Sequence, residues 1–424
     1  MLASRAQAAR SVQRIARSFA TVADAAGVKV AAVDVGQPTS SVTLLVKAGS
    51  RFEPKAGAAH ALKNFSYKST AKRSALGTVR EAELYGGVLS STLSREHLAL
   101  TAEFLRGDEE FFVDVLTSFA TSAKFTRHEF LEYVTPIVEG ETAAAQSDNG
   151  VRAVELAHAL AFRNGLGASL FAPAHSSITH EDVKAFASSA FAKGNIAVLG
   201  TGIDQARLAA LIEKSPFASL GAGAAASTSP SRYFGGESRL EAHGGPQTVF
   251  IGFGSTGSPA ELAVLSAFVS AEPAGKWLQS SSPLAAAIPT NASVKPVFLP
   301  YSDAALVGLL VQGETPEAVK AAGTAAVSAL KSASTAKPTD FTKAVAKARF
   351  AAANALETRD GLVSVLGSKV LAGSDASVQN ALSSLDKLSV DGLSKTATSL
   401  FKSKPTYVAV GDIAALPFAD ELGL

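Results

Sequence analysis

The sequence predicts an α+β fold made of two similar lobes, each an antiparallel-rich sheet with helices packed on one face. Runs with strand periodicity alternate with runs of helical periodicity along the chain. Two motifs recur at nearly equal offsets, because Gly49 and Gly254 are 205 residues apart and Gly200 and Gly411 are 211 apart. Such offsets indicate duplication of a unit of about 200 residues. The stretch 217–231 between the halves is rich in Gly, Ala and Ser, the composition of a flexible linker.

The first half begins with a strand at 28–34, and 39–47 is predicted to pair with it. Thr126 with Glu129 has the spacing of a capping box, and Thr179 with Asp182 is predicted to cap a later helix. Further strands are expected at 88–95, 97–105 and 196–200. Helices are expected at 56–69, 78–85, 109–122, from Thr126 toward Glu141, and at 151–162, 181–193 and 204–214.

The second half repeats this plan. A strand at 247–253 leads through a glycine loop to a helix at 258–269, and the strand at 407–413 matches the one at 196–202. The predicted organisation is therefore a leader at 1–19, a first lobe at 20–216, the flexible linker at 217–231 and a second lobe at 232–424.

The first 23 residues have the composition of a mitochondrial presequence, since they contain no acidic residue and four arginines. The alternative for this segment is a disordered basic tail or a nucleic-acid arm. The run Arg17-Ser18-Phe19-Ala20 resembles a matrix cleavage site, with the cut between Phe19 and Ala20. The arginines are Arg5, Arg10, Arg14 and Arg17.

Composition excludes several classes of function. The chain of 424 residues has no cysteine, so it has no disulfide and no thiolate metal site. It contains no run of 18 apolar residues, so no membrane-spanning helix is predicted. Removal of residues 1–19 lowers the basic residues from 39 to 35 against 37 acidic residues, and the formal charge changes from +2 to −2. The remaining chain has no basic excess for nucleic acid. One small basic cluster, interpreted as a solvated or partner-facing surface, comprises Lys63, Lys68, Lys72 and Arg73.

The segment 57–70 contains a zinc-site frame from which the chemistry is missing. In the motif His-x-x-Glu-His, two histidines on one helix face hold zinc and the glutamate acts as general base. Here the frame runs from His60 to Asn64. Lys63 replaces the base, and a lysine that is protonated near neutral pH cannot accept a proton. Asn64 replaces the second histidine, and its amide is a poor ligand for zinc.

The flanks of this frame resemble the pitrilysin-like peptidases of family M16. An apolar strand at 42–46, the loop Ala48-Gly-Ser-Arg-Phe-Glu-Pro54 and the closing run Phe65-x-Tyr-Lys-Ser-Thr70 stand in the family's order. The family's third zinc ligand is a Glu about 75 residues further on. That spacing reaches Glu139 and Glu141, and Glu141 is favoured. The resemblance implies a degenerate site without metal or catalytic residues, because only His60 and one carboxylate remain.

This family includes the mitochondrial processing peptidase and the core proteins of the cytochrome bc1 complex. The resemblance implies a non-catalytic core subunit of the respiratory complex, peripheral on the matrix side of the mitochondrial inner membrane. Its partners would be a related core protein and the other subunits of a homodimeric complex, with no cofactor of its own and membrane association only through partners. The alternative is the non-catalytic alpha subunit of the processing peptidase, but that subunit's glycine-rich loop would fall at 271–281, which holds one glycine. Lys63→Glu with Asn64→His is expected to rebuild zinc affinity if Glu141 is the third ligand.

Overall fold

The computed structural model describes residues 22–34, 36–223, 226, 228–273, 282–373 and 378–424. The chain divides into two compact units. Unit 1 contains residues up to Thr142 together with Ser169–Thr228 and Ala355–Asn380, and unit 2 contains Ala143–Ala168, Ser229–Asn354 and Ala381–Leu424. The predicted presequence at 1–19 and its cleavage bond between Phe19 and Ala20 lie outside the described residues.

Unit 1 is built on a six-stranded sheet with the order β1-β2-β6-β3-β5-β4. Neighbouring strands are antiparallel except β2 and β6, which are parallel. The predicted pairing of 28–34 with 39–47 is wrong, because β6 lies between β2 and β3. All six residues of β6 are buried, and pairing on both edges satisfies their backbone polar groups. The strands are β1 (Ala23–Ala25), β2 (Val28–Val33), β3 (Thr39–Val46), β4 (Val88–Leu93), β5 (Leu98–Leu105) and β6 (Ile196–Thr201).

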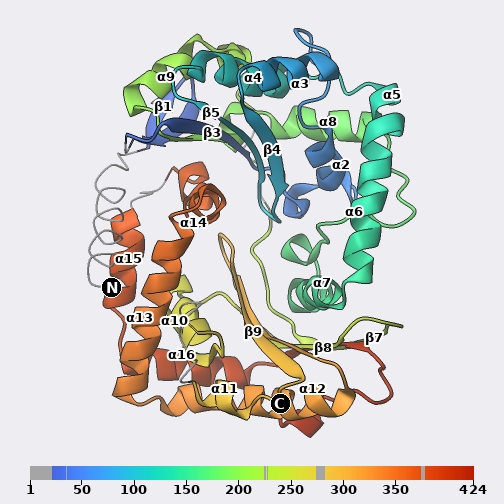
Figure 1. The fold of residues 1–424 in the computed structure, drawn as a ribbon, viewed down its shortest axis with the longest axis vertical. Helices are drawn as coiled ribbons and strands as arrows, with labels where there is room; N and C mark the ends of the chain where they lie inside the picture. The colour runs from blue at the N-terminus through green and yellow to red at the C-terminus, as the bar shows by residue number, and fades with distance from the viewer. Residues whose placement is uncertain (1–21, 35, 224–225, 227, 274–281, 374–377) are drawn as a thin grey trace. The chain divides into compact units, whose positions relative to one another are not determined.

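The main helical layer of unit 1 covers the sheet face that carries Val42, Leu44 and Val46 (Figure 1). The opposite face carries Leu45, and α14 (Arg359–Leu371) from the second half of the chain packs there with Gly367 beside Leu45. The first-half helices of the unit are α2 (Ala58–Phe65), α3 (Ala75–Leu84), α4 (Glu109–Ser122), α5 (Arg127–Glu129), the π-helical turn η2 (Phe130–Val134), α6 (Thr135–Ser147), α8 (His180–Ala190) and α9 (Gln205–Lys214), and the end of α6 from Ala143 onward belongs to unit 2.

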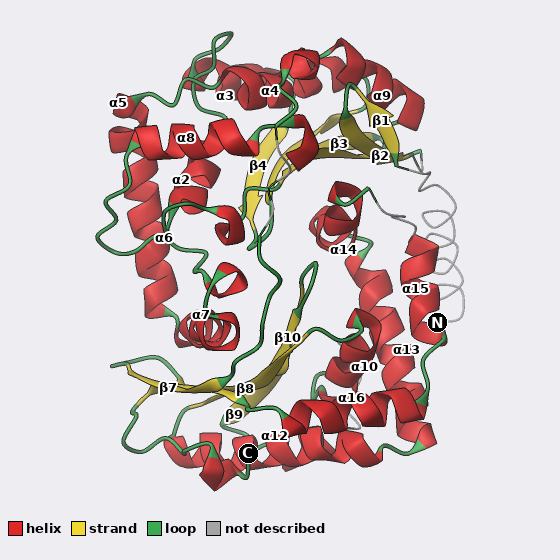
Figure 2. Cartoon of the chain, turned by 180° about the vertical axis from the view of Figure 1, so that it is seen from behind, coloured by secondary structure: helices red, strands yellow, loops and turns green. Residues whose placement is uncertain are grey.

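Unit 2 has a five-stranded sheet with the order β7-β11-β8-β10-β9, in which only β7 and β11 are parallel. Helices such as α12 and α16 lie on one face, and α7 (Asn149–Phe162) from the first half of the chain lies on the other (Figure 2). The strands are β7 (Gly236–Glu241), β8 (Gln247–Ser255), β9 (Ala292–Pro300), β10 (Ala305–Gly313) and β11 (Thr406–Gly411). The second-half helices are α10 (Pro259–Val269), α11 (Pro283–Ala287), α12 (Pro316–Ser332), α13 (Pro338–Ala355), α15 (Val378–Asp386) and α16 (Val390–Lys402).

The two sheets share one topology, which confirms the predicted pair of similar lobes. The order β2-β6-β3-β5-β4 of unit 1 corresponds strand for strand to β7-β11-β8-β10-β9 of unit 2, including the single parallel pair. Helices α7 and α14 also correspond, because they begin 210 residues apart at Asn149 and Arg359. Each of them packs on the sheet of the other half, so each compact unit contains one helix from the opposite half. None of the helices in the described ranges has the length and apolar character that a membrane span requires.

Candidate functional site

Helix α2 begins at Ala58 because two residues before it prepare its N-terminus. Gly57 has a φ of 88°, a left-handed conformation that glycine adopts without steric cost. A Cβ atom at Gly57 would lie 2.8 Å from the Cα atom of Ala172. The carboxylate of Glu53 accepts hydrogen bonds from the backbone N–H groups of Gly57 at 3.1 Å and Ala59 at 2.9 Å. These bonds satisfy donors that the first helical turn leaves unpaired. Burial nevertheless raises the pKa of Glu53 to about 7.

Helix α2 ends at Phe65, four residues earlier than the predicted end at Ser69. Tyr67 has a φ of 62°, and a bulky side chain in this left-handed region cannot continue a right-handed helix. The Tyr67 hydroxyl donates to the carbonyl oxygens of Ser90 at 2.9 Å and Thr101 at 3.1 Å. Two hydrogen bonds thus fix the hydroxyl end of Tyr67. The site residues His60, Lys63 and Asn64 all lie before the helix ends at Phe65.

The three α2 residues of the predicted frame converge on one carboxylate of α6. His60 Nε2 lies 2.6 Å from Glu141 Oε2, and Asn64 Nδ2 lies 2.9 Å from the same oxygen. Lys63 Nζ lies 2.5 Å from the other oxygen, Oε1. Helical spacing explains the convergence, because positions 60, 63 and 64 lie on one face of a helix. The His60 side chain is 4% exposed, Lys63 20% and Glu141 34%, so the cluster is buried at its base and open to solvent at its rim.

Ala172 fixes the tautomer of His60. The backbone N–H of Ala172 donates to His60 Nδ1 at 3.1 Å, so Nδ1 must carry a lone pair. The proton of the neutral imidazole then resides on Nε2, the atom that faces Glu141. The ring of Phe171 meets the His60 ring edge to face at 5.7 Å between centroids, which supports this orientation. His60 is therefore a hydrogen-bond donor to Glu141.

The pKa shifts in the cluster agree with this pattern. Burial lowers the pKa of His60, because a buried site favours the neutral ring. This effect outweighs that of Glu141, which acts to raise the pKa. Burial alone would raise the pKa of Glu141, but hydrogen bonds from Lys63, Asn64 and His60 outweigh it and lower that pKa to about 2. Glu141 is therefore a carboxylate throughout the physiological range.

Of the two acids that the spacing reached, Glu141 faces α2 and Glu139 does not. Glu141 contacts all three α2 residues, whereas Glu139 is exposed two positions earlier on α6. A shift of two positions turns a helical side chain by roughly 200° about the axis, so both acids cannot face α2. The contribution of Ala172 was not found from the sequence. Its backbone N–H leaves no mark in residue type, and it lies 112 positions from His60.

The residues of this cluster do not fit a zinc ion. A zinc site needs three ligand atoms that direct lone pairs to one point. Here His60 Nε2 carries a proton, Lys63 brings a positive charge, and the Asn64 amide nitrogen rather than its oxygen faces Glu141. Elsewhere in the described ranges, no group of three or more His, Cys, Asp or Glu side chains is placed to hold a metal ion.

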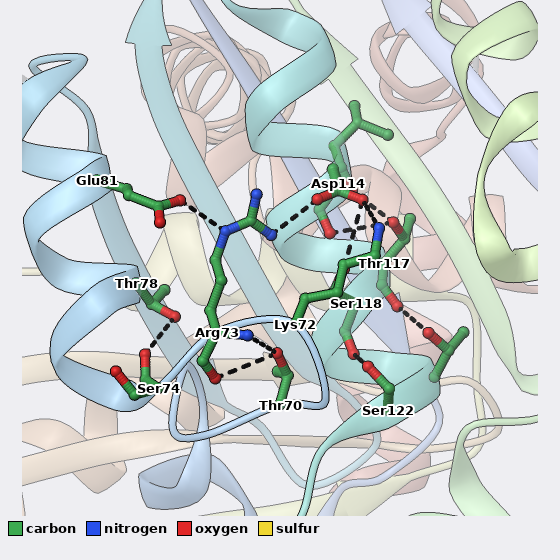
Figure 3. Close-up of polar contacts among 12 residues, drawn as sticks. Thr70, Lys72, Arg73, Ser74, Thr78, Glu81, Asp114, Thr117, Ser118 and Ser122 are labelled. Carbon is green, nitrogen blue, oxygen red and sulfur yellow. Dashed lines mark hydrogen bonds and ion pairs between the residues drawn. The ribbon is translucent and has the colours of Figure 1, made fainter.

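Lys72 and Arg73, predicted to belong to a basic surface, are matched by acids within unit 1 (Figure 3). Asp114 of α4 accepts from Lys72 Nζ at 2.6 Å and from Arg73 Nη1 at 2.7 Å, and Arg73 Nε donates to Glu81 of α3 at 2.7 Å. The guanidinium of Arg73 also lies 5.2 Å from the centroid of the Phe111 ring. These contacts join the loop after α2 to α3 and α4 and balance the charges locally.

The chain is similar to one peptidase family and to subunits of the mitochondrial cytochrome b-c1 complex. The family model for insulinase, peptidase family M16, matches residues 29–174. The mitochondrial cytochrome b-c1 complex subunit 2 of Cryptococcus neoformans var. grubii is 45% identical to the chain, over 99% of this chain and 98% of that protein. The mitochondrial cytochrome b-c1 complex subunit 2 of Yarrowia lipolytica is 37% identical, over 97% of this chain and 99% of that protein.

A solved structure gives the same fold. A chain in the structure of complex III2 from Candida albicans with bound Inz-5 matches with a TM-score of 0.79 and 18% sequence identity. The match covers 95% of this chain and 98% of that chain. The two-lobed architecture is therefore shared along nearly the whole length of both chains.

Proposed function

The chain belongs to peptidase family M16 and, within it, to the cytochrome b-c1 complex subunit 2 proteins, and we propose from this that it is the non-catalytic core subunit 2 of mitochondrial ubiquinol–cytochrome c reductase, complex III. The observation that carries the proposal is the extent of the likeness, 45% identity over 99% of the chain and 98% of the relative. The role is that of a scaffold for assembly and stability of the complex.

The candidate site supports a structural role. It has no general base, because the position of the catalytic glutamate holds Lys63, whose ammonium is engaged by Glu141. It has no free imidazole lone pair toward the centre, because His60 Nε2 is a donor. This donor pattern supports the proposal that His60, Lys63, Asn64 and Glu141 are a degenerate zinc-peptidase site, in a chain without catalytic residues or a cofactor of its own.

The partners follow from membership of the complex. They are core protein 1 and the other subunits of a homodimeric complex III, which carry the haems and the iron–sulfur cluster. The chain is peripheral on the matrix side of the mitochondrial inner membrane, and its membrane association runs through those partners. The presequence at 1–19 is removed at the Phe19–Ala20 bond, and the mature repeats run over 20–216 and 232–424 with 217–231 as their linker.

The alternative, an alpha subunit of the processing peptidase, lacks a comparable observation in its favour. The segment 271–281, where that subunit's glycine-rich loop would fall, contains one glycine. Residues 274–281 of this segment lie outside the part of the chain that the structure describes.

Native electrophoresis of mildly solubilised mitochondria tests the proposed function. The chain is followed by antibody, and b- and c-type haems by their absorbance. Co-migration of the chain with both haems in one large complex is the expected result. Migration in a small haem-free heterodimer that cleaves presequence peptides would overturn the proposal in favour of the processing peptidase.

A further inference from the structure

All three side chains that α2 presents at the degenerate site are hydrogen-bond donors. His60 offers Nε2–H, Lys63 its ammonium and Asn64 its amide N–H₂. A metal site has the opposite polarity, with lone pairs directed inward from every ligand. Charged and neutral donors around one carboxylate form the short, strong hydrogen bonds that anion recognition uses. The distances of 2.5, 2.6 and 2.9 Å to Glu141 have this character.

Backbone groups help to orient two of the three donors. The Ala172 N–H holds the His60 tautomer, as described above. Asn64 Nδ2 also donates to the backbone carbonyl of His60 at 3.2 Å. A flipped amide would set its oxygen against two acceptors, that carbonyl and Glu141, so the surroundings select one orientation. His60 is therefore oriented independently of any carboxylate, and both the His60 carbonyl and Glu141 hold the Asn64 amide.

We propose that His60, Lys63 and Asn64 form a carboxylate-binding site that the chain's own Glu141 occupies. The site fastens α6 to α2 and takes over the position of the ancestral metal centre. Charge supports this assignment, because Lys63 and Glu141 balance each other where a dication would have stood. The chemical class that the site accepts is a small carboxylate, and Glu141 is a tethered example.

Removal of the tethered carboxylate tests this assignment by chemical rescue. Glu141→Ala in the full-length chain leaves the three donors around an opening that solvent can reach, because the Glu141 side chain is 34% exposed. The thermal midpoint of this variant is measured while sodium formate or acetate is titrated at constant ionic strength with chloride. The expected result is a lower midpoint than in the parent chain and a saturable rise of about 1–3 °C with formate, as linkage to a one-site ligand requires.

Matched controls isolate the site. Glu139→Ala removes an exposed carboxylate from the same helix and should show neither the loss nor the rescue. Acetamide, which has the shape of acetate without its charge, should not rescue Glu141→Ala. Rescue should also disappear when Lys63→Met and Asn64→Ala are added. The assignment is overturned if formate affects Glu141→Ala no more than Glu139→Ala, or if zinc stabilises the unsubstituted chain.

A second measurement covers the case in which Glu141→Ala does not fold. In a cycle of Lys63→Met, Glu141→Gln and the double variant, the double variant should lower the midpoint by clearly less than the sum of the two single changes. Additive shifts would mean that the ammonium and the carboxylate are not coupled, and would overturn the assignment.

Discussion

His60 keeps the residue type of a zinc ligand, but its hydrogen bonds have the opposite polarity. The sequence located His60, Lys63, Asn64 and the acid near 141 because helical spacing and motif order depend on residue type alone. The direction of the His60 hydrogen bond depends on the loop that contains Phe171 and Ala172, which the fold brings to α2 from 112 positions away. Residue identity could therefore be predicted, and the donor role of His60 could not.

This polarity changes the expected outcome of restoring the motif. Lys63→Glu with Asn64→His supplies the missing base and ligand, and Glu141 already faces α2. The Ala172 N–H still donates to His60 Nδ1, which keeps the proton on Nε2 and opposes coordination through that atom. We therefore expect substoichiometric zinc in the purified variant, measured by elemental analysis after dialysis. One tightly held zinc per chain would show that the loop at 171–172 moves away when metal binds.

At the scale of helices and strands, two similar cap patterns have different outcomes. Thr179 and Asp182 form the expected capping box at the start of α8, with each side chain bonded to the other's backbone N–H. Thr126 does not cap α5 in this way. Its hydroxyl donates to Glu129 Oε2, while Glu129 Oε1 accepts from the backbone N–H of Ser69. The buried Glu129 is recruited by a distant loop, and a local pattern carries no information about such competition.

The capping box predicts a pH dependence. Hydrogen bonds from Lys55 and from Thr179 lower the pKa of Asp182 from 3.8 to about 2. A lowered folded-state pKa means that the ionised carboxylate stabilises the fold above about pH 4, and that this contribution is lost as the pH falls toward 2. Asp182→Asn should therefore lower the thermal midpoint at pH 7, and the difference from the parent should shrink as the pH falls. Asp340→Asn serves as the control, because Asp340 lies in the first turn of α13 with its side chain 48% exposed and 3.5 Å from Lys343 Nζ. A difference that does not vary with pH would contradict the role of the Asp182 charge.

Two glycines near the site predict opposite effects of the same substitution. Gly57→Ala places a Cβ 2.8 Å from the Ala172 backbone at a left-handed residue, so it should destabilise the chain by at least about 1 kcal/mol. Gly140→Ala adds a methyl group in open space on α6, and should stabilise the chain by about 0.5–1 kcal/mol through helix propensity. Urea unfolding followed by circular dichroism measures both. If Gly57→Ala changed the free energy of unfolding by the same amount and in the same direction as Gly140→Ala, the Gly57 conformation would not constrain the start of α2.

At the scale of the whole chain, the duplication could be predicted but the helix exchange could not. Equal offsets between motifs survive in sequence, and the shared sheet order confirms the two lobes. Helices α7 and α14 have ordinary apolar faces, and nothing in their sequences identifies which sheet receives them. The position of β6 between β2 and β3 could not be predicted for the same reason, because it depends on pairing across 150 or more positions.

Because α7 and α14 each pack on the sheet of the other half, the two halves should depend on each other for folding. A fragment of residues 20–216 lacks α14 and leaves the sheet face around Leu45 uncovered. A fragment of residues 232–424 lacks α7, which covers Phe250 and Val408. Each fragment expressed alone should be insoluble or molten, whereas co-expression should give a soluble complex of the two. Cooperative unfolding of the first fragment alone, measured by calorimetry, would contradict this dependence.

The most direct test of a scaffold without chemistry is electron transfer per haem in complexes that carry Glu141→Gln. This change removes the charge that His60, Lys63 and Asn64 surround, and Glu139→Gln on the same helix is the matched control. We predict that Glu141→Gln lowers the amount of assembled complex, measured by b-type haem, while cytochrome c reduction per haem stays equal to the parent and the control. An unchanged amount of complex with altered turnover per haem would contradict the account, because the site would then take part in the reaction.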